Sequence, residues 1–172
     1  MGETKKKKSG REKPAVQHYE SMYKYLNDNV KTNRAGKRMV KWKDTWWEQS
    51  RQALCRYYSS PAVWHELAAP GWTVFHQRVL KQSGKHRHQG GLPIYIVSGK
   101  GYSVIDGVRY DWKKGDLLIM PFKPLGCEHQ HFSEDPDNAL APVWIALRWC
   151  PFSEFSASDD QQMETHPDWP GK

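Results

Sequence analysis

Two pairs of histidines in this chain have a spacing that suits metal binding. His86 and His88 are separated by one residue, and so are His129 and His131. In a β-strand, residues i and i+2 point to the same face, so each pair predicts two imidazoles directed to one side. Imidazole is a good ligand for divalent transition-metal ions. An antiparallel barrel can bring distant strands face to face, and we therefore predict that the two pairs bind one ion.

Four further side chains are candidates for substrate binding. Arg78 could pair with a substrate carboxylate, and His76 lies two residues before it on the same predicted strand. Gln89 follows the first histidine pair, and Tyr95 lies a few residues beyond it. Each has a structural alternative: a surface arginine, a hydrogen-bonded histidine, a glutamine that bonds to an imidazole, and a packed tyrosine.

The elements that must position these residues read as short strands. From about Ala53 the chain alternates extended segments with turn signals such as Pro70-Gly71 and Asp106-Gly107. Several short strands at this spacing predict an all-β sandwich or barrel. The predicted strands cover residues 53–58, 72–80, 94–97, 102–105, 108–110, 117–120 and 143–149.

The flanking segments differ from this part in composition. Residues 1–43 hold 13 Lys and Arg against 4 Asp and Glu, whereas the other 129 residues hold 13 against 15. We expect 1–43 to be a basic extension and 44–150 to be the β-domain. Within the extension we expect disorder over 1–14 and, from the apolar spacing, an amphipathic helix over 15–27. The polar, acidic residues 151–172 predict a poorly ordered tail.

Composition also excludes several classes. The three cysteines form no CxxC pair, which argues against a disulfide framework and a thiolate zinc site. The sequence has no apolar run of the roughly 18 residues that a membrane span needs, and no secretory signal. It lacks the paired features of a nucleic-acid module, so nucleic-acid binding is not expected. We expect a cytoplasmic protein.

The spacing around the histidines resembles the two motifs of the cupin family. The first motif places HxH before a glutamate and a glycine; here His86, His88 and Gly99 match, and Leu92 stands where the glutamate is expected. The second runs from Gly115 through Pro121 to His129, with the histidine about three residues late. The resemblance covers roughly residues 72–149. It implies a small antiparallel β-barrel, the double-stranded β-helix or jelly roll, with an N-terminal helical or extended addition.

The resemblance also implies a metal site and a chemistry. The expected ligands are His86, His88 and His129, with His131 as a fourth ligand or as a group behind the ligands. Without the glutamate, the set is similar to three-histidine iron cupins such as gentisate dioxygenases. That implies an iron(II) dioxygenase acting on a small aromatic or carboxylated substrate. The alternatives are a lyase or isomerase using zinc, nickel or manganese, and a non-catalytic ligand-binding cupin. The resemblance and the many aromatic residues together predict a homodimer.

Overall fold

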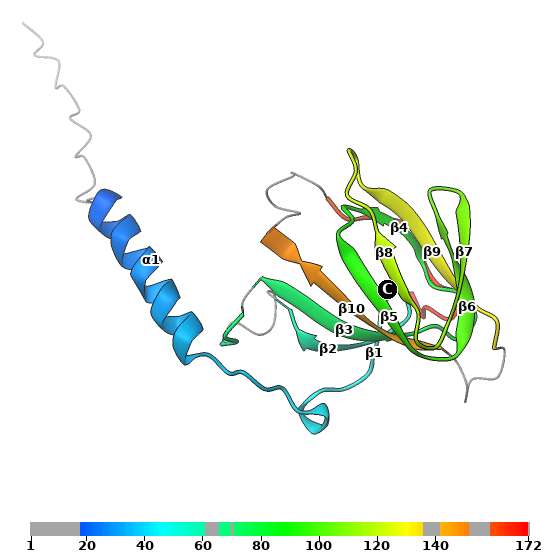
Figure 1. The fold of residues 1–172 in the computed structure, drawn as a ribbon, viewed down its shortest axis with the longest axis horizontal. Helices are drawn as coiled ribbons and strands as arrows, with labels where there is room; N and C mark the ends of the chain where they lie inside the picture. Colours follow the sequence, from blue (N-terminus) through cyan, green and yellow to red (C-terminus); the bar gives the residue numbers. More distant parts are fainter. Residues whose placement is uncertain (1–17, 61–65, 70, 136–141, 152–158, 172) are drawn as a thin grey trace, which may run out of the picture.

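The computed structural model describes residues 18–60, 66–69, 71–135, 142–151 and 159–171, and within them two antiparallel sheets face each other (Figure 1). The first sheet has the order β1-β2-β3-β10-β5-β8. Its strands are β1 (Glu48–Gln49), β2 (Leu54–Ser59), β3 (Trp72–Arg78), β10 (Val143–Trp149), β5 (Leu92–Ser98) and β8 (Leu117–Met120). All its neighbouring strands are antiparallel.

The second sheet carries both histidine pairs. Its order is β11-β4-β9-β6-β7, again antiparallel throughout. The strands are β11 (Gln161–Glu164), β4 (Lys85–His88), β9 (Cys127–Ser133), β6 (Lys100–Ile105) and β7 (Val108–Lys113). The predicted all-β jelly-roll class is confirmed, although the two sheets are not joined into one closed ladder within the described residues.

The hydrophobic core lies between the sheets. On β5 the alternate residues Leu92, Ile94 and Ile96 are buried, while Tyr95 between them is exposed. This two-residue period directs one face of the strand inward and fixes its register. The facing sheet contributes Trp112, whose ring packs edge-to-face on Trp144 with the centroids 5.5 Å apart. The two indoles therefore tie one sheet to the other beside the histidines.

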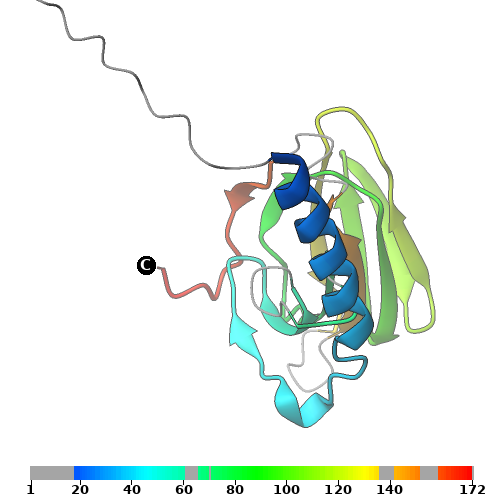
Figure 2. The same ribbon diagram turned by 90° about the vertical axis from the view of Figure 1, so that its left-hand side faces the viewer.

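The N-terminal helix is longer than predicted. Helix α1 runs over His18–Ala35, so it extends past the predicted end at residue 27 into polar sequence. It lies to one side of the sheets in Figure 1 and in front of them in Figure 2, with its apolar side chains exposed. A short 3-10 turn, η1 (Trp42–Asp44), follows it. The predicted disorder over 1–14 lies outside the described residues.

The C-terminal segment corrects a second prediction. We expected a poorly ordered tail after residue 150, but residues 161–164 form β11, which pairs with β4 beside His86. A strand that joins the histidine sheet is part of the domain.

No helix in the described part of the chain combines the length and apolarity that a membrane span requires.

Candidate metal centre

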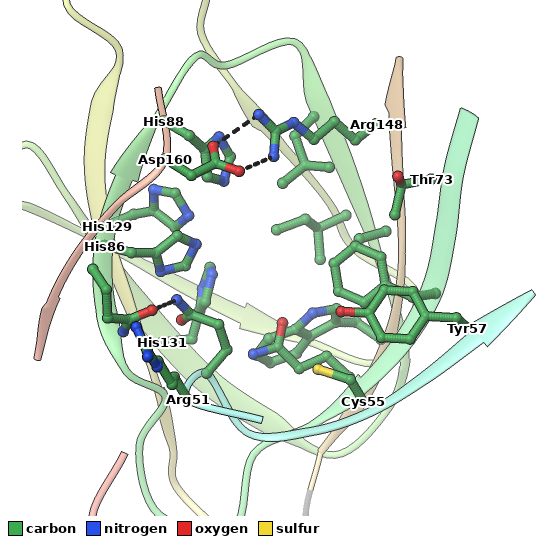
Figure 3. Close-up of a pocket in the computed structure, with 18 of the residues that line it drawn as sticks. Arg51, Cys55, Tyr57, Thr73, His86, His88, His129, His131, Arg148 and Asp160 are labelled. Carbon is green, nitrogen blue, oxygen red and sulfur yellow. Dashed lines mark hydrogen bonds and ion pairs between the residues drawn. The ribbon is translucent and has the colours of Figure 1, made fainter. Parts of the chain in front are cut away.

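Three histidines from two adjacent strands converge in the structure. His86 on β4 lies directly opposite His129 on β9, and His88 is two residues further along β4. One ring nitrogen from each of the three residues lies within 4.8 Å of the others. The ring centroids are 4.0 Å apart for His86 and His129 and 4.7 Å for His88 and His129. Figure 3 shows the three rings together on one wall of a pocket.

Backbone carbonyls orient two of these rings. Nδ1 of His88 lies 2.7 Å from the carbonyl oxygen of Gln89, and Nδ1 of His129 lies 3.1 Å from that of Cys127. A carbonyl oxygen only accepts, so each Nδ1 carries the proton and donates it. Nε2 of both rings is therefore left with a free lone pair, which is the state that a metal ligand needs.

Burial keeps the three imidazoles neutral. Burial, together with the nearby His88 and His131, lowers the pKa of His86 to about 3. Burial is also the largest cause of the lowered pKa of His88 and of the strongly lowered pKa of His129. Because protons do not compete for these nitrogens near neutral pH, the donor set fits a divalent cation.

A tight loop supports the site. Gly126 has a φ of 74°, and a Cβ there would lie 2.6 Å from the backbone carbonyl of His88. Only glycine combines that conformation with so close an approach. The chain can thus enter β9 directly behind His88, which accommodates the longer loop before His129.

His131 has different surroundings from the other three. Its Nδ1 lies 2.7 Å from Oγ of Ser103, and the same oxygen accepts a hydrogen bond from Nε1 of Trp112 at 2.8 Å. The buried Ser103 hydroxyl has no other acceptor within the described residues, so its own proton goes to Nδ1. Since burial lowers the pKa of His131 to about 3, the ring is neutral and carries its proton on Nε2. It offers an N–H where the other rings offer a lone pair.

The histidines form one wall of a pocket of about 320 Å³ between the sheets. That is the lower end of the size range of small-molecule sites. Apolar and aromatic side chains line much of the opposite wall, while Arg148 and Asp160 lie at one end of the pocket and Arg51 at the other (Figure 3). The apolar and aromatic lining comprises Tyr57, Phe75, Leu92, Ile94, Trp144 and Ala146, and the charged lining other than histidine comprises Arg51, Arg148 and Asp160.

Several solved structures are similar to the chain in fold. Streptomyces Pac13, a nucleoside dehydratase, is 14% identical over 78% of this chain and 99% of that one, with a TM-score of 0.54. Salicylate 1,2-dioxygenase from Pseudaminobacter salicylatoxidans is 16% identical over 89% of this chain and 40% of that one, with a TM-score of 0.51. The chain has the cupin fold.

Such low identities show the fold and leave the reaction open. A third similar structure, the plu4264 protein from Photorhabdus luminescens, is 16% identical over 69% of this chain and 91% of that one, with a TM-score of 0.53. The sequence matches no family model and no curated protein. Leu92, at the position of the cupin glutamate, is buried in the pocket wall, so the departure seen in the sequence lies within the site.

Two predicted substrate-binding residues lie on the wrong side of the cupin sheet. His76 and Arg78 share a face of β3 that points outward, where His76 packs among aromatic rings and Arg78 lies over Trp47 with its guanidinium 5.1 Å from the ring centroid. The residues of β3 that line the pocket have the opposite parity: Thr73, Phe75 and Gln77. The predicted contact of His76 and Arg78 with substrate in this pocket is therefore corrected.

Tyr95 and Gln89, the other two predicted substrate-binding residues, are also absent from the pocket lining. Tyr95 is on the outer face of β5 and is 46% exposed. Gln89 is buried, but its amide binds the backbone of Lys123 in both directions, accepting from the N–H and donating to the carbonyl. It secures the loop before β9, so its role in this structure is to hold that loop.

Sequence reasoning missed the charged pair Arg148 and Asp160 at one end of the pocket. Arg148 shares the inward parity of Trp144 and Ala146 on β10, which was a signal available in the sequence. Asp160 lies in the segment that was expected to be a tail, and no local pattern brings it near histidines some 70 residues earlier.

Proposed function

We propose that this cupin is a non-haem iron(II) dioxygenase acting on a small aromatic or carboxylated substrate. The observation that carries the proposal is the convergence of three neutral histidines, His86, His88 and His129, on one wall of a partly apolar pocket. Three neutral ligands leave the full charge on the ion and keep coordination positions free for other oxygens. Iron(II) bound there would supply the electrons for dioxygen chemistry.

The chain's own residues would orient the substrate and keep water out. Leu92, Ile94 and Trp144 provide an apolar wall against which an aromatic ring can pack. His131, in the same pocket, has its protonated Nε2 available as a hydrogen-bond donor to a substrate oxygen. We therefore assign His131 a positioning role and leave the three-residue set as ligands.

A second function is favoured by one comparison. Pac13 is similar over nearly its whole length, whereas the dioxygenase is matched over 40% of its chain. A lyase or isomerase that uses zinc, nickel or manganese as a Lewis acid would need the same three ligands. Oxygen separates the two functions, because a dioxygenase consumes it and a lyase does not.

The metal content of the purified protein tests both proposed functions. We expect near-stoichiometric divalent metal in anaerobically purified protein by elemental mass spectrometry, and its loss in His86→Ala and His129→Ala. The matched control is His76→Ala, which removes a histidine from the outer face of the same domain. Iron together with oxygen uptake on a carboxylated aromatic compound would support the dioxygenase. Zinc, nickel or manganese would favour the lyase, and absence of metal would leave a ligand-binding cupin.

We also propose a homodimer in the cytoplasm. An apolar groove of about 660 Å³ crosses the outer face of β2, β3 and β10, next to several exposed aromatic residues. Apolar surface of this kind commonly marks an interface. Light scattering should give twice the chain mass. Leu147→Lys in the groove should lower the measured mass toward that of one chain, while Val108→Lys on the other sheet should leave it unchanged.

The proposed cytoplasmic location agrees with the state of the cysteines. The three free cysteines suit a reducing compartment.

A further inference from the structure

Arg148 is an unusual residue for the inward face of a sheet. On β10 it follows Trp144 and Ala146 at two-residue intervals, and all three line the pocket. In the strand register it lies opposite Thr73, another lining residue. Its side chain is only 18% exposed. A guanidinium in such a position needs an anionic partner.

Asp160 provides that partner in the structure. Its two carboxylate oxygens each accept a hydrogen bond of 2.9 Å, one from Nη1 and one from Nη2 of Arg148. This two-bond geometry is the one that any small carboxylate adopts on an arginine. The pair is asymmetric, because the Asp160 side chain is 60% exposed and reaches the arginine from the solvent side.

The position of the pair connects it to the metal centre. In Figure 3, Arg148 and Asp160 lie at the same end of the pocket as His88. Among the described residues, the pocket lining also includes Arg51, so this described lining has two arginines and one carboxylate. A ligand whose carboxylate sat on Arg148 would have its other end directed into the cavity that the histidines line.

The segment that carries Asp160 lies at the edge of the sheet. Asp160 precedes β11, a four-residue edge strand whose pairing with β4 has a register irregularity between Gln162 and Glu164. We propose that Arg148 is the carboxylate-binding position of this pocket, and that a small organic acid binds by replacing the Asp160 side chain there. The identity of this acid as a substrate rests on the proposed function, but the anion site itself does not require the metal.

Ligand preference tests the proposal. The probes are benzoate and benzyl alcohol, which differ in charge and have the same ring, and the measurement is the ratio of their dissociation constants by calorimetry. We expect Asp160→Asn to raise the preference for benzoate about tenfold, because the competing carboxylate is gone. Arg148→Gln should abolish the preference. The matched control is Asp111→Asn, which breaks an arginine–aspartate pair on the outside of β7.

The outcomes are separable from those of the metal experiment. Titrations are run on zinc-reconstituted protein and repeated after chelation, so that a failure to bind metal leaves the anion test intact. A higher benzoate preference in Asp160→Asn but not in Asp111→Asn supports the proposal, even if Arg148→Gln does not fold. An unchanged preference in Asp160→Asn, with or without a lower melting temperature, overturns it and leaves the pair as a structural attachment of β11.

Discussion

The proton on His131 determines what this side chain can offer a ligand. Ser103 accepts from Trp112 and donates to Nδ1 of His131, so the structure predicts an Nε2–H tautomer. Nitrogen-15 spectra of the imidazole should show it. Ser103→Ala should remove this preference and lower the free energy of unfolding by about 1–3 kcal/mol, because the indole N–H loses a buried acceptor.

The control for this substitution lies on the same sheet. The hydroxyl of Ser133, at the end of β9, bonds to the backbone of Asp135 and is only partly buried. Ser133→Ala should leave the His131 tautomer unchanged. Protonation at Nδ1 in the unmodified protein would contradict the assignment and make Nε2 available to a metal.

Leu92 allows the missing cupin carboxylate to be tested directly. Leu92→Glu places a carboxyl group in an apolar, buried position, so the metal-free protein should unfold at a lower temperature. A divalent ion would compensate this charge. Zinc should therefore raise the melting temperature of Leu92→Glu more than that of the unmodified protein or of the neutral, similarly sized Leu92→Gln. An equal rise in all three would place residue 92 out of reach of the ion.

Strand parity explains which residues the sequence could place. His86 and His88 share a face at any register, so their pairing followed from spacing alone. On β3 both parities hold apolar residues, with Trp72 and Val74 on one face and Phe75 on the other. The pattern did not indicate which face was inner, and His76 and Arg78 were assigned to the wrong side.

Elements formed by tertiary contacts were the hardest to predict. Residues 161–164 read Gln-Gln-Met-Glu and have no apolar alternation, yet they form β11 because the edge of β4 offers unpaired backbone groups. In contrast, β10 is rich in apolar residues and was predicted with its observed bounds, and the predicted strand 94–97 covers the middle of β5. The site's histidines were therefore predictable, while its C-terminal border was not.

The side chain of Gln162 is predicted to hold β11 in place. Its amide accepts from Gln52 at 2.6 Å and donates to the backbone carbonyl of Glu164 at 2.6 Å. Gln162→Ala should loosen this edge, and backbone amides of β4 should exchange hydrogen roughly tenfold faster. Gln161→Ala is the control, since the Gln161 side chain bonds only to the exposed Asp159 among described residues. Equal exchange rates of the β4 amides in both variants would show that backbone pairing alone holds β11 in place.

Four histidines in one pocket make the stability of the whole domain sensitive to acid. Burial lowers the pKa of His86, His88, His129 and His131, whereas in the unfolded chain these groups titrate near 6.5. As the pH falls below that value, the unfolded chain takes up protons that the folded one does not. This contribution to stability is then complete above about pH 6.5 and declines as the pH falls, by at most ~1.4 kcal/mol per unit for each histidine. For His86 and His131 the decline continues to about pH 3.

Urea unfolding of the metal-free protein at pH 7.5 and pH 5 measures this effect. Burial raises the pKa of Asp160, but Arg148 outweighs that effect and the pKa is lowered. Asp160 therefore contributes to the pH dependence of stability only below this pH interval. His131→Gln removes one of the four groups and should reduce the loss of stability between the two pH values. His18→Gln, on the exposed helix α1, should not. If the two variants lose stability equally, the pocket histidines already exchange protons with solvent in the folded state, and protons would then compete with the metal over the same pH interval.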